Sequence, residues 1–418
     1  MFRPLDVPGN KDPLERTRQV TLPPQARSRQ AHMLAQAAAE GRFALLQCRS
    51  CGTFVAPAHD CCPVCLAGEF SLGDAATGGT VLSLTEAEVP FLTYFRERAP
   101  WRVALVRLDC GPIVLAHAHY GCEESGKVTM SLKLDKAGQA VFYAAPEGSE
   151  ATYMDDPQWR EMTADPRHRR ILITDGRNPV TPALVKDLLK AGARKVFVGV
   201  PDDWKPFPAG DELIQLKMVK LVPLDVRSER SVFELSHAYA AKTEILINTT
   251  DHIRPGGYLA PGQLSHTAEA MDVVAMGLMR LATRFAPIMA ARGADGDTGA
   301  AAWVNVLSVY AQTPSAVFAG YSMAHAAALN LSHSLRAELR QGGIRMMNVL
   351  TGASESEWLQ TMPQPRVTAR VLSRSIVDGL KRGLEDVHVG AVAQDIHERL
   401  LSNPKAAERE IAATRPGG

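Results

Sequence analysis

The chain has 418 residues, of which 46% are hydrophobic and 22% are charged, and its formal net charge is +1. A single core rarely grows beyond about 250–300 residues, so we expect two or three domains. A net charge near zero gives no general attraction to nucleic acid or to an anionic membrane, so partners should be recognised by shape.

The beginning of the chain carries no targeting signal that we recognise. Residues 1–30 are polar and rich in Pro and Arg, without the apolar core of a signal peptide. No uninterrupted apolar run approaches the roughly 20 residues of a membrane span. We therefore expect a cytoplasmic protein without a membrane partner. All seven cysteines precede position 123, and this clustering favours metal binding over a disulfide framework.

The first predicted elements belong to a compact N-terminal module. A tail and a helix over 26–42 precede a cysteine-rich segment at 43–71. Residues 72–146 should form a small β-barrel. The reason is a set of five β-rich runs separated by Gly and Asp, at 79–84, 102–108, 112–116, 127–132 and 140–143.

Residues 147–169 are polar, carry charges of both signs and lack periodicity, which is typical of a linker. The pattern then changes to apolar strands alternating with helices. Thr181 is a candidate helix N-cap, Pro182 suits the first turn and Gly192 the end. This alternation predicts an α/β Rossmann-like doubly wound parallel sheet over 170–400, followed by a tail at 401–418. The predicted strands lie at 171–173, 195–200, 222–224, 245–247, 304–307 and 344–350.

Two C-x2-C knuckles give the strongest local signal, from Cys48, Cys51, Cys62 and Cys65. A spacing of two residues lets both thiolates of a knuckle reach one Zn²⁺, and two knuckles complete a closed tetrahedral shell. A closed shell leaves no position for a reactive water, so the predicted zinc is structural. Cys61 in place of Cys62, or His59 as fourth ligand, remains an alternative.

Two further groups of residues attract attention without a motif. Cys110 and Cys122 have no partner pattern, so we interpret them as small buried or half-buried side chains. His117 and His119 alternate on one strand and share a face. We interpret that face as half-exposed, with a metal site as the alternative.

The order of elements in the N-terminal module carries a family resemblance. Gly41-Arg42-Phe43 leads into the first knuckle, Pro57 stands between the knuckles, and Gly79-Thr80-Val81 and the strand 103–108 follow. Residues 26–146 resemble the DUF35 family, which pairs a rubredoxin-like zinc ribbon with an OB fold. The resemblance implies a non-catalytic partner of thiolase-fold enzymes, or of acyl-CoA aldolases and hydratases, with an acyl-CoA substrate handled by the complex. Nucleic-acid binding, which an OB fold also permits, is disfavoured because aromatic residues make up only 6% of the chain.

The C-terminal part resembles the short-chain dehydrogenase/reductase family over residues 169–400. Ser308 is followed thirteen positions later by Tyr321, and the segments 335–339 and 343–349 continue the match. The resemblance implies that the Ser orients the substrate oxygen, that the Tyr is the general acid/base, and that a Lys four residues later lowers the pKa of the Tyr and holds the cofactor ribose. Here the Lys position is His325, which is largely neutral near pH 7 and reaches less far.

The cofactor loop departs further from the family, whose T-G-x-x-x-G-x-G turn holds a pyrophosphate. The aligned positions carry Asp, Pro and Thr in place of the three glycines, within Thr174, Asp175, Gly176, Pro179 and Thr181. A carboxylate near a diphosphate and a missing N–H both oppose dinucleotide binding. Asp225 keeps the adenine-side contact of the family. The N-N-A-G segment corresponds to 248–251, and the helical Asn of the proton relay falls near Val274.

We therefore do not expect NAD(P) to bind, and we interpret Ser308 and Tyr321 as hydrogen-bonded remnants. The long helices over 268–290 and 321–340 correspond to the four-helix dimer interface of the family, so we expect a homodimer, or a heterodimer with an active relative. The Met-rich face includes Met271, Met276, Met279 and Met289.

These observations lead to one hypothesis and one rival. The hypothesis is a non-catalytic, zinc-containing accessory subunit of a thiolase-fold acyl-CoA-processing complex, whose dehydrogenase-like domain oligomerises or shapes a site. The rival is an NAD(P)-dependent oxidoreductase that acts on a 3-hydroxyacyl or 3-oxoacyl thioester. Asp251, His252 and His325 leave a different acid/base reaction open.

Overall fold

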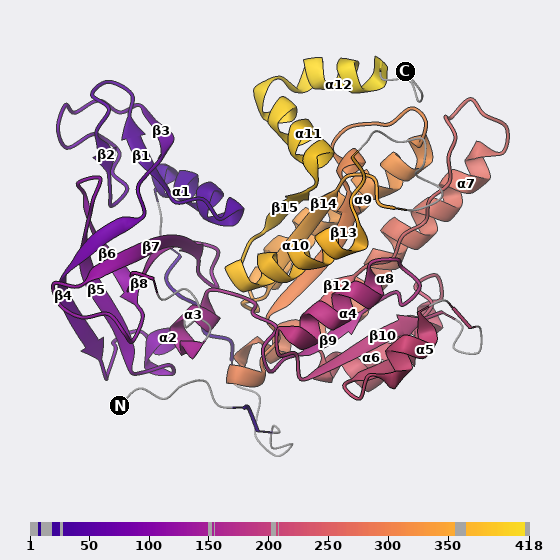
Figure 1. Cartoon of the computed structure of the whole chain (residues 1–418), viewed down its shortest axis with the longest axis horizontal. Helices are drawn as coiled ribbons and strands as arrows, with labels where there is room; N and C mark the ends of the chain where they lie inside the picture. Colours follow the sequence, from indigo (N-terminus) through magenta and orange to yellow (C-terminus); the bar gives the residue numbers. More distant parts are fainter. Residues whose placement is uncertain are drawn as a thin grey trace. The chain divides into compact units, whose positions relative to one another are not determined.

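The structure is a computed structural model, and it describes residues 7–9, 19–25, 28–148, 153, 155–201, 206–207, 209–355 and 365–413 (Figure 1). The chain divides into two compact units. The first is built around Thr21–Asp165 and the second around Pro166–Lys381 with the C-terminal segment.

The first unit begins with helix α1 (Arg29–Glu40), which packs on the zinc ribbon. The Ser28 side chain accepts a hydrogen bond from the Ala31 N–H at 3.3 Å, and Gly41 ends the helix in the left-handed conformation with φ 73°. Leu34, Ala37 and Ala38 are buried in one cluster with residues of the ribbon. The ribbon sheet has the order β2-β1-β3, from β1 (Ala44–Cys48), β2 (Phe54–Val55) and β3 (Phe70–Asp74). The predicted helix is thus present, with residues 26 and 27 outside the described part of the chain.

Five strands close into a barrel, as the sequence predicts. The barrel has the order β4-β5-β6-β8-β7, and the short helix α2 (Thr93–Arg96) lies between the first two strands in sequence. Alternate side chains point inward, so Val106, Val114 and Met130 are buried in a common core. The strands are β4 (Gly78–Ala87), β5 (Trp101–Leu108), β6 (Ile113–Ala118), β7 (Lys127–Leu134) and β8 (Ala140–Pro146).

The segment predicted to be a linker, 147–169, requires a correction. It contains helix α3 (Pro157–Glu161), and its residues Trp159 and Met162 are buried with Tyr94 and Tyr143 of the barrel module. The segment is polar on average, but two large apolar side chains are enough to fix it on the barrel. Most of this stretch therefore belongs to the first unit.

The second unit is a seven-stranded parallel sheet with the order β11-β10-β9-β12-β13-β14-β15, which confirms the predicted Rossmann-like class. The central strands are buried on both faces, which explains why they read as continuous apolar runs. The strands are β9 (Arg170–Ile173), β10 (Lys195–Val200), β11 (Val219–Pro223), β12 (Ile245–Asn248), β13 (Ala302–Ser308), β14 (Arg345–Thr351) and β15 (Asp386–Val389).

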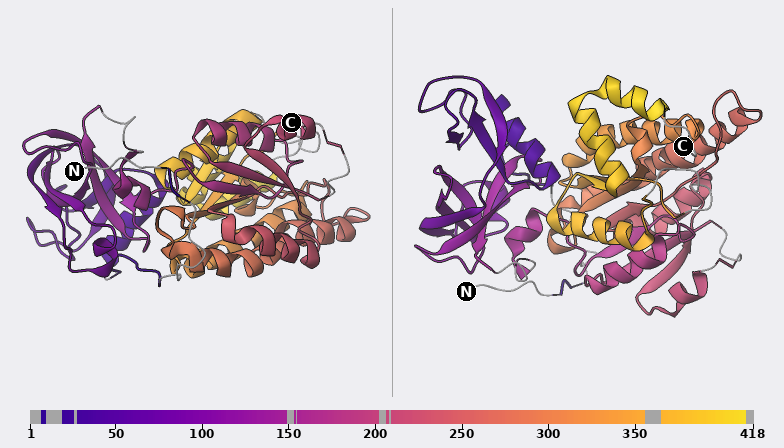
Figure 2. Two further views of the ribbon diagram at one scale, coloured as in Figure 1. Left: turned by 90° about the horizontal axis from the view of Figure 1, so that it is seen from below. Right: turned by 45° about the horizontal axis from the view of Figure 1, so that its top comes forward.

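Helices cover both faces of this sheet (Figure 2). One face carries α6 (Glu229–Tyr239), α8 (Gly277–Ala291) and α9 (Ala319–Arg340), whose apolar side chains share a core with Leu172, Leu246 and Trp303. The opposite face carries α4 (Thr181–Lys190) and α10 (Ala369–Arg382). Shorter elements are α5 (Gly210–Gln215), η2 (Ala240–Lys242), η4 (Arg292–Ala294), η5 (Gly296–Thr298) and η6 (Val309–Ala311).

One continuous helical stretch contains α7 (Gln263–Ala270), a π-helical turn η3 (Met271–Met276) and α8. Among the described residues, Gln263–Ala294 is the stretch long and apolar enough to cross a membrane by length and composition alone. Core helices of soluble proteins pass the same test, and 44% of its most apolar window is buried inside the structure. Val274, at the position where the family has its relay Asn, lies in the π-helical turn and is buried.

The predicted tail at 401–418 also requires a correction. After α11 (Ala391–Ser402), helix α12 spans Pro404–Ala413. Ala407 is buried and Ile411 packs against the cluster that contains Tyr321. The described part of this segment is thus helical, and residues 414–418 lie outside the described residues.

A buried carboxyl in the first unit generates a prediction about pH. Asp156 accepts hydrogen bonds from the Tyr143 hydroxyl at 2.5 Å and from the Gln158 N–H at 2.8 Å. Burial raises the pKa of Asp156 to about 6, against the hydrogen bonds and the charge of Arg102, which act in the opposite direction. Protonated Asp156 therefore stabilises the folded first unit. This stabilisation is fully present below the pKa that Asp156 has in the unfolded chain, and it is lost as the pH rises through about 6.

We expect this group to lower the free energy of unfolding of the first unit by about 1 kcal/mol between pH 5 and pH 7. Chemical denaturation of the full chain and of Asp156→Asn at several pH values measures the difference, since the Asn cannot ionise and keeps one acceptor oxygen. The unfolding free energies of the two proteins should diverge with pH. Parallel pH profiles would contradict the assignment.

Candidate functional site

The zinc ribbon brings four thiols together. The sulfurs of Cys48, Cys51, Cys62 and Cys65 all lie within 4.8 Å of one another, with 3.5 Å between Cys48 and Cys65 and 3.6 Å between Cys51 and Cys62. A tetrahedral Zn²⁺ with Zn–S bonds of about 2.3 Å requires sulfurs roughly 3.8 Å apart. The spacing therefore fits a zinc ion held by these four residues.

The knuckle backbones explain how the thiols converge. The Gly52 N–H donates to the Cys48 carbonyl at 2.9 Å, and the Leu66 N–H donates to the Cys62 carbonyl at the same distance. Gly52 has φ 73°, a conformation that Gly adopts without strain. The alternatives Cys61 and His59 are exposed and lie outside the four-sulfur cluster.

The degenerate cofactor loop lies at the carboxyl end of β9, before α4. Thr174 is buried, and its hydroxyl donates to Asn248 at 2.9 Å, which ties the loop to the end of β12. Gly176 is the one Gly of the loop, and an added Cβ would lie 2.9 Å from a methyl of Val198, so the packing requires Gly here. Pro179 is exposed.

The carboxylate of Asp175 accepts hydrogen bonds from backbone N–H groups of this loop. The Asp175 carboxylate accepts a hydrogen bond from the Arg177 N–H at 2.8 Å and a second from the Asn178 N–H. Burial raises the pKa of Asp175 to about 6, and the nearby charge of Asp251 raises it too, while the amides lower it. Both amides lie in the loop before α4, which begins at Thr181.

The remaining amides of the loop also have partners inside the protein. The Asp175 N–H donates to Thr249, the Gly176 N–H to Gly199, and the Val180 N–H to the Asn178 side chain. Thr181 begins α4 and is not its cap; its N–H donates to the Asn178 carbonyl and its hydroxyl to the Asp175 carbonyl. Every backbone N–H from Asp175 to Thr181 is engaged, apart from Pro179, which has none.

The retained adenine-side residue is also paired. Both carboxylate oxygens of Asp225 lie 3.2 Å from the guanidinium of Arg227. One of them accepts the Arg227 N–H as well, at 3.0 Å. Both carboxylate oxygens of Asp225 are therefore hydrogen-bonded to Arg227.

Ser308, Tyr321 and His325 are brought together at the end of β13 and the start of α9, and all three are buried. Tyr321 and His325 stand one turn apart with ring centroids 4.3 Å from each other. The Ser308 N–H donates to His325 Nδ1 at 3.2 Å, and His325 Nε2 lies 3.1 Å from an Asp251 carboxylate oxygen. Since Nδ1 is an acceptor here, Nε2 carries the proton that is donated to Asp251.

This arrangement opposes proton transfer by Tyr321. Burial raises the pKa of Tyr321 well above its usual value, and the charge of Asp251 raises it further, while a hydrogen bond with Ser308 lowers it. A cation beside the phenol would lower that pKa, but a neutral imidazole with both nitrogens engaged does not. The site therefore holds a protonated phenol in a closed hydrogen-bond network.

His117 on β6 and His119 just after the strand differ in burial, since His117 is partly exposed and His119 is buried. His117 Nδ1 accepts a hydrogen bond from the Trp101 indole at 2.9 Å, and burial lowers the pKa of His117 to about 4. His119 is buried just after the strand, and its Nδ1 accepts the Gly121 N–H at 3.1 Å. The interpretation of a half-exposed face thus holds for His117, which is partly exposed, and is wrong for His119, which the loop after the strand covers.

Several functional contacts have no counterpart in a sequence motif. The role of Asn178 and Thr249 in closing the loop depends on β9 and β12 being neighbours in the sheet. The engagement of His325 with the Ser308 amide depends on the angle between α9 and β13. One sequence signal points to the closing of the loop by Asn178. It is an acidic residue and an Asn near the start of a loop that precedes a helix.

We expect one zinc ion per chain. Cys62→Ser should lose the metal and make the zinc ribbon sensitive to protease, because metal binding and local folding are coupled. Elemental analysis and limited proteolysis of the purified full chain measure both effects. Cys61→Ser is the matched control and should retain full occupancy, whereas full zinc content in Cys62→Ser would assign the ligand to Cys61 or His59.

Comparisons with known proteins agree with this architecture. Residues 35–71 match the rubredoxin-like zinc ribbon domain of ChsH2, and residues 74–135 match the C-terminal OB-fold domain of ChsH2. Residues 169–366 match the short chain dehydrogenase family.

Individual relatives resemble the second unit. Short-chain dehydrogenase PC-15 of Penicillium crustosum is 32% identical over 158 residues, which are 36% of this chain and 54% of that protein. Short-chain dehydrogenase ptmH of Penicillium ochrochloron is 31% identical over 157 residues, with the same coverage. The chain thus spans about half the length of these curated relatives.

One solved structure is similar enough to compare in sequence as well as fold. It is a short chain dehydrogenase from Burkholderia cenocepacia in complex with NADP, with a TM-score of 0.53 and 26% identity, covering 59% of this chain and 98% of that one. The chain thus carries zinc-ribbon and OB-fold domains of the ChsH2 (DUF35) type in its N-terminal part and a short chain dehydrogenase domain in its C-terminal part.

Proposed function

We propose that this protein is a non-catalytic, zinc-containing accessory subunit that docks a thiolase-fold enzyme acting on an acyl-CoA. The observation that carries the proposal is the Asp175 carboxylate on the amides of Arg177 and Asn178. It engages two amides of the loop that corresponds to the family's pyrophosphate turn. The dehydrogenase-like unit is then a scaffold.

The closed network around Tyr321 supports the same proposal. Hydride transfer to or from a carbonyl needs a group that gives or takes a proton near neutral pH. The phenol of Tyr321 is raised in pKa, and the imidazole of His325 has no free nitrogen. A network of this kind stabilises the fold without offering a proton to a substrate.

The barrel offers a docking surface, which we define as the barrel face: Leu82, Leu105, Ile113 and Leu115. Leu105 and Leu115 are direct cross-strand partners on β5 and β6, and Ile113 lies two residues before Leu115. All four side chains are exposed, and Leu115 is 66% exposed. Apolar side chains that gather on neighbouring strands mark interaction sites in soluble proteins.

The dehydrogenase-like unit also presents exposed apolar residues, for which we propose a homodimer through α8 and α9. Met276, Met279 and Met323 are exposed on these helices or the turn before them. Met289, which the sequence pattern groups with them, is fully buried in the core and does not belong to this face. Met side chains adapt readily to a partner surface.

An NAD(P)-dependent oxidoreductase that acts on a 3-hydroxyacyl or 3-oxoacyl thioester is the second candidate. Ser308 and Tyr321 are retained side by side, and the similar Burkholderia cenocepacia structure is a complex with NADP. This candidate requires the Asp175 carboxylate to leave the loop amides on cofactor binding.

Calorimetric titration of the full chain distinguishes the two candidates. We expect NAD(H) and NADP(H) to bind weakly or not at all, since two like charges about 5 Å apart repel by roughly 0.8 kcal/mol even in water and by more when partly buried. Asp175→Gly should strengthen binding at least about tenfold by releasing two amides. A micromolar dissociation constant for the unaltered chain would establish the oxidoreductase and reject the scaffold.

Co-purification with a thiolase-fold enzyme encoded beside this protein tests the docking surface. Leu105→Glu and Leu115→Glu should each weaken the complex at least about tenfold, since a central apolar contact contributes about 2 kcal/mol or more. Leu401→Glu is the matched control, because Leu401 is 65% exposed on α11 in the other unit. Equal retention of all three variants would place the contact elsewhere, and turnover of an acyl-CoA by this chain alone would contradict the accessory role.

A further inference from the structure

One charged side chain stands among the apolar residues of the barrel face. Arg107 lies on β5 two residues after Leu105, so both side chains point to the outside of the barrel. The pairing of β5 with β6 places Arg107 opposite Ile113, and Leu105 opposite Leu115. All four side chains are exposed. The Arg107 side chain is therefore a close neighbour of three of the four residues that define the barrel face.

The other outward-facing residues of the described strands β4, β5 and β6 carry no charge near neutral pH. Directly opposite residues of antiparallel strands share a face, and burial lowers the pKa of His117 on this face to about 4. Glu86 and Arg102 belong to the alternate positions, on the opposite side of the strands, where their side chains lie 3.7 Å apart. The remaining paired positions on the outside are neutral: Thr80, Ser83, Thr85, Ala87, Trp101 and Val103.

The guanidinium of Arg107 has no ion-pair partner in the described part of the chain. Among the described residues, no hydrogen bond or ion pair involves it. Asp109 follows two residues later, but its carboxylate lies over Gly78 on β4, and one of its oxygens is 4.0 Å from Lys127 Nζ. As long as the barrel face is exposed, water solvates the charge of Arg107.

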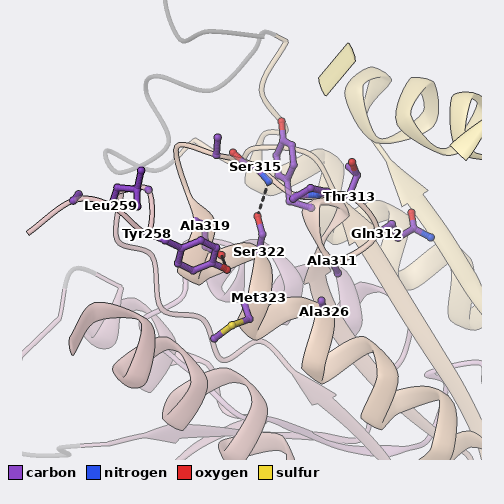
Figure 3. Close-up of a pocket in the computed structure, with 15 residues that line it drawn as sticks. Tyr258, Leu259, Ala311, Gln312, Thr313, Ser315, Ala319, Ser322, Met323 and Ala326 are labelled. Carbon is purple, nitrogen blue, oxygen red and sulfur yellow. Dashed lines mark hydrogen bonds between the residues drawn. The ribbon is translucent and has the colours of Figure 1, made fainter. Parts of the chain in front are cut away.

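A pocket of the second unit offers a comparison. It has a volume of about 770 Å³ and opens beside the first turns of α9, between the loops 257–260 and 310–316 (Figure 3). No charged side chain lines this pocket, so filling it removes no charge from water. Covering the barrel face does remove one, because Arg107 stands within it.

This removal from water determines what the covering surface must contain. A buried charge is strongly unfavourable unless an opposite charge pairs with it. Since no carboxylate of the described residues pairs with Arg107, the covering surface has to supply one. The planar guanidinium matches a carboxylate with two parallel hydrogen bonds, which also fixes the orientation of the two surfaces.

We propose that Arg107 forms an ion pair with a carboxylate of the docking partner, an Asp or Glu side chain surrounded by apolar residues. The inference rests on the proposed docking through the barrel face, and it adds the chemistry that the partner's surface must present. The leucines supply apolar contact area. The ion pair sets the register and excludes partners with an uncharged or basic patch at this position.

Two other occupants of the barrel face fit these residues less well. A second copy of the chain offers no carboxylate on its own barrel face. Proteins that bind single-stranded nucleic acid combine a track of cations with exposed aromatic side chains. Here one cation stands among aliphatic residues, and Trp101 is only 4% exposed. The face therefore fits an acidic site on the surface of a different protein.

Affinity measurements between the full chain and the thiolase-fold enzyme of the co-purification experiment test the proposal. Arg107→Leu should weaken the complex at least about thirtyfold, because it leaves the partner's carboxylate buried and unpaired. Arg107→Lys keeps the charge and should weaken the complex less. The matched control is Arg374→Leu, at an exposed position of α10, which should bind like the unaltered chain. The melting temperature of Arg107→Leu alone should be unchanged, because the guanidinium has no bond to lose.

Charge reversal locates the partner's carboxylate. Arg107→Glu should abolish the complex, because two carboxylates then face each other. Replacing each surface Asp and Glu of the enzyme by Lys, one at a time, should find one position that restores binding to Arg107→Glu. Rescue at no position would overturn the proposal, since coupling between two paired residues is reciprocal.

The remaining outcomes separate the ion pair from the docking itself. If Leu105→Glu weakens the complex and Arg107→Leu does not, the barrel face docks the enzyme without the ion pair, and only the ion pair is rejected. If neither variant weakens the complex, or no complex forms, the proposed docking is wrong and the ion pair with it. An oligothymidylate that binds the chain through Arg107 would assign this residue to nucleic acid and would also reject the proposal.

Discussion

The contact between the Asp175 carboxylate and the amides of the loop after β9 is the constraint on which our proposal for the second unit depends. The backbone N–H groups of a loop need hydrogen-bond partners wherever water does not reach them. In a dinucleotide-binding loop that partner is an external phosphate. Here it is a side chain two residues earlier in the chain, with Asn178 and Thr249 engaging the other amides. The loop is complete without a ligand, so an incoming anion must displace bonds and overcome a charge of its own sign.

Around His325, too, the polar groups find their hydrogen-bond partners inside the protein. Replacing a lysine by histidine removes a fixed positive charge, and the imidazole then needs a donor on one side and an acceptor on the other. The Ser308 amide and the Asp251 carboxylate supply them. Asp251 also lies close enough to Tyr321 and Asp175 to raise the pKa of both. The acidic residue that lies against His325 Nε2 therefore makes both the phenol and the loop carboxyl harder to ionise.

The sequence was sufficient for the parts of the structure that local rules determine. Knuckle spacing identified the four thiols that converge. β-rich runs separated by Gly and Asp located the barrel strands, and apolar strands alternating with helices predicted the parallel sheet. The prediction of a linker at 147–169 was wrong. Trp159 and Met162 are isolated apolar residues in a polar stretch, and the sequence alone does not show that they pack on the barrel. The tail after 400 was wrong for a related reason, since Ala407 and Ile411 contact a core assembled from distant residues. The sequence did not predict the partners of the loop amides or the pocket, because both depend on which segments meet at the ends of strands.

The loop after β9 and the pocket beside α9 differ in the charge of the side chains that line them. At the family's cofactor position, carboxylates and fully engaged amides oppose an anion. Beside α9, a lining without charged side chains offers an apolar surface. A fold that loses its cofactor contacts keeps its loops and helices, because the sheet positions them. The cavity between those loops does not depend on the cofactor contacts.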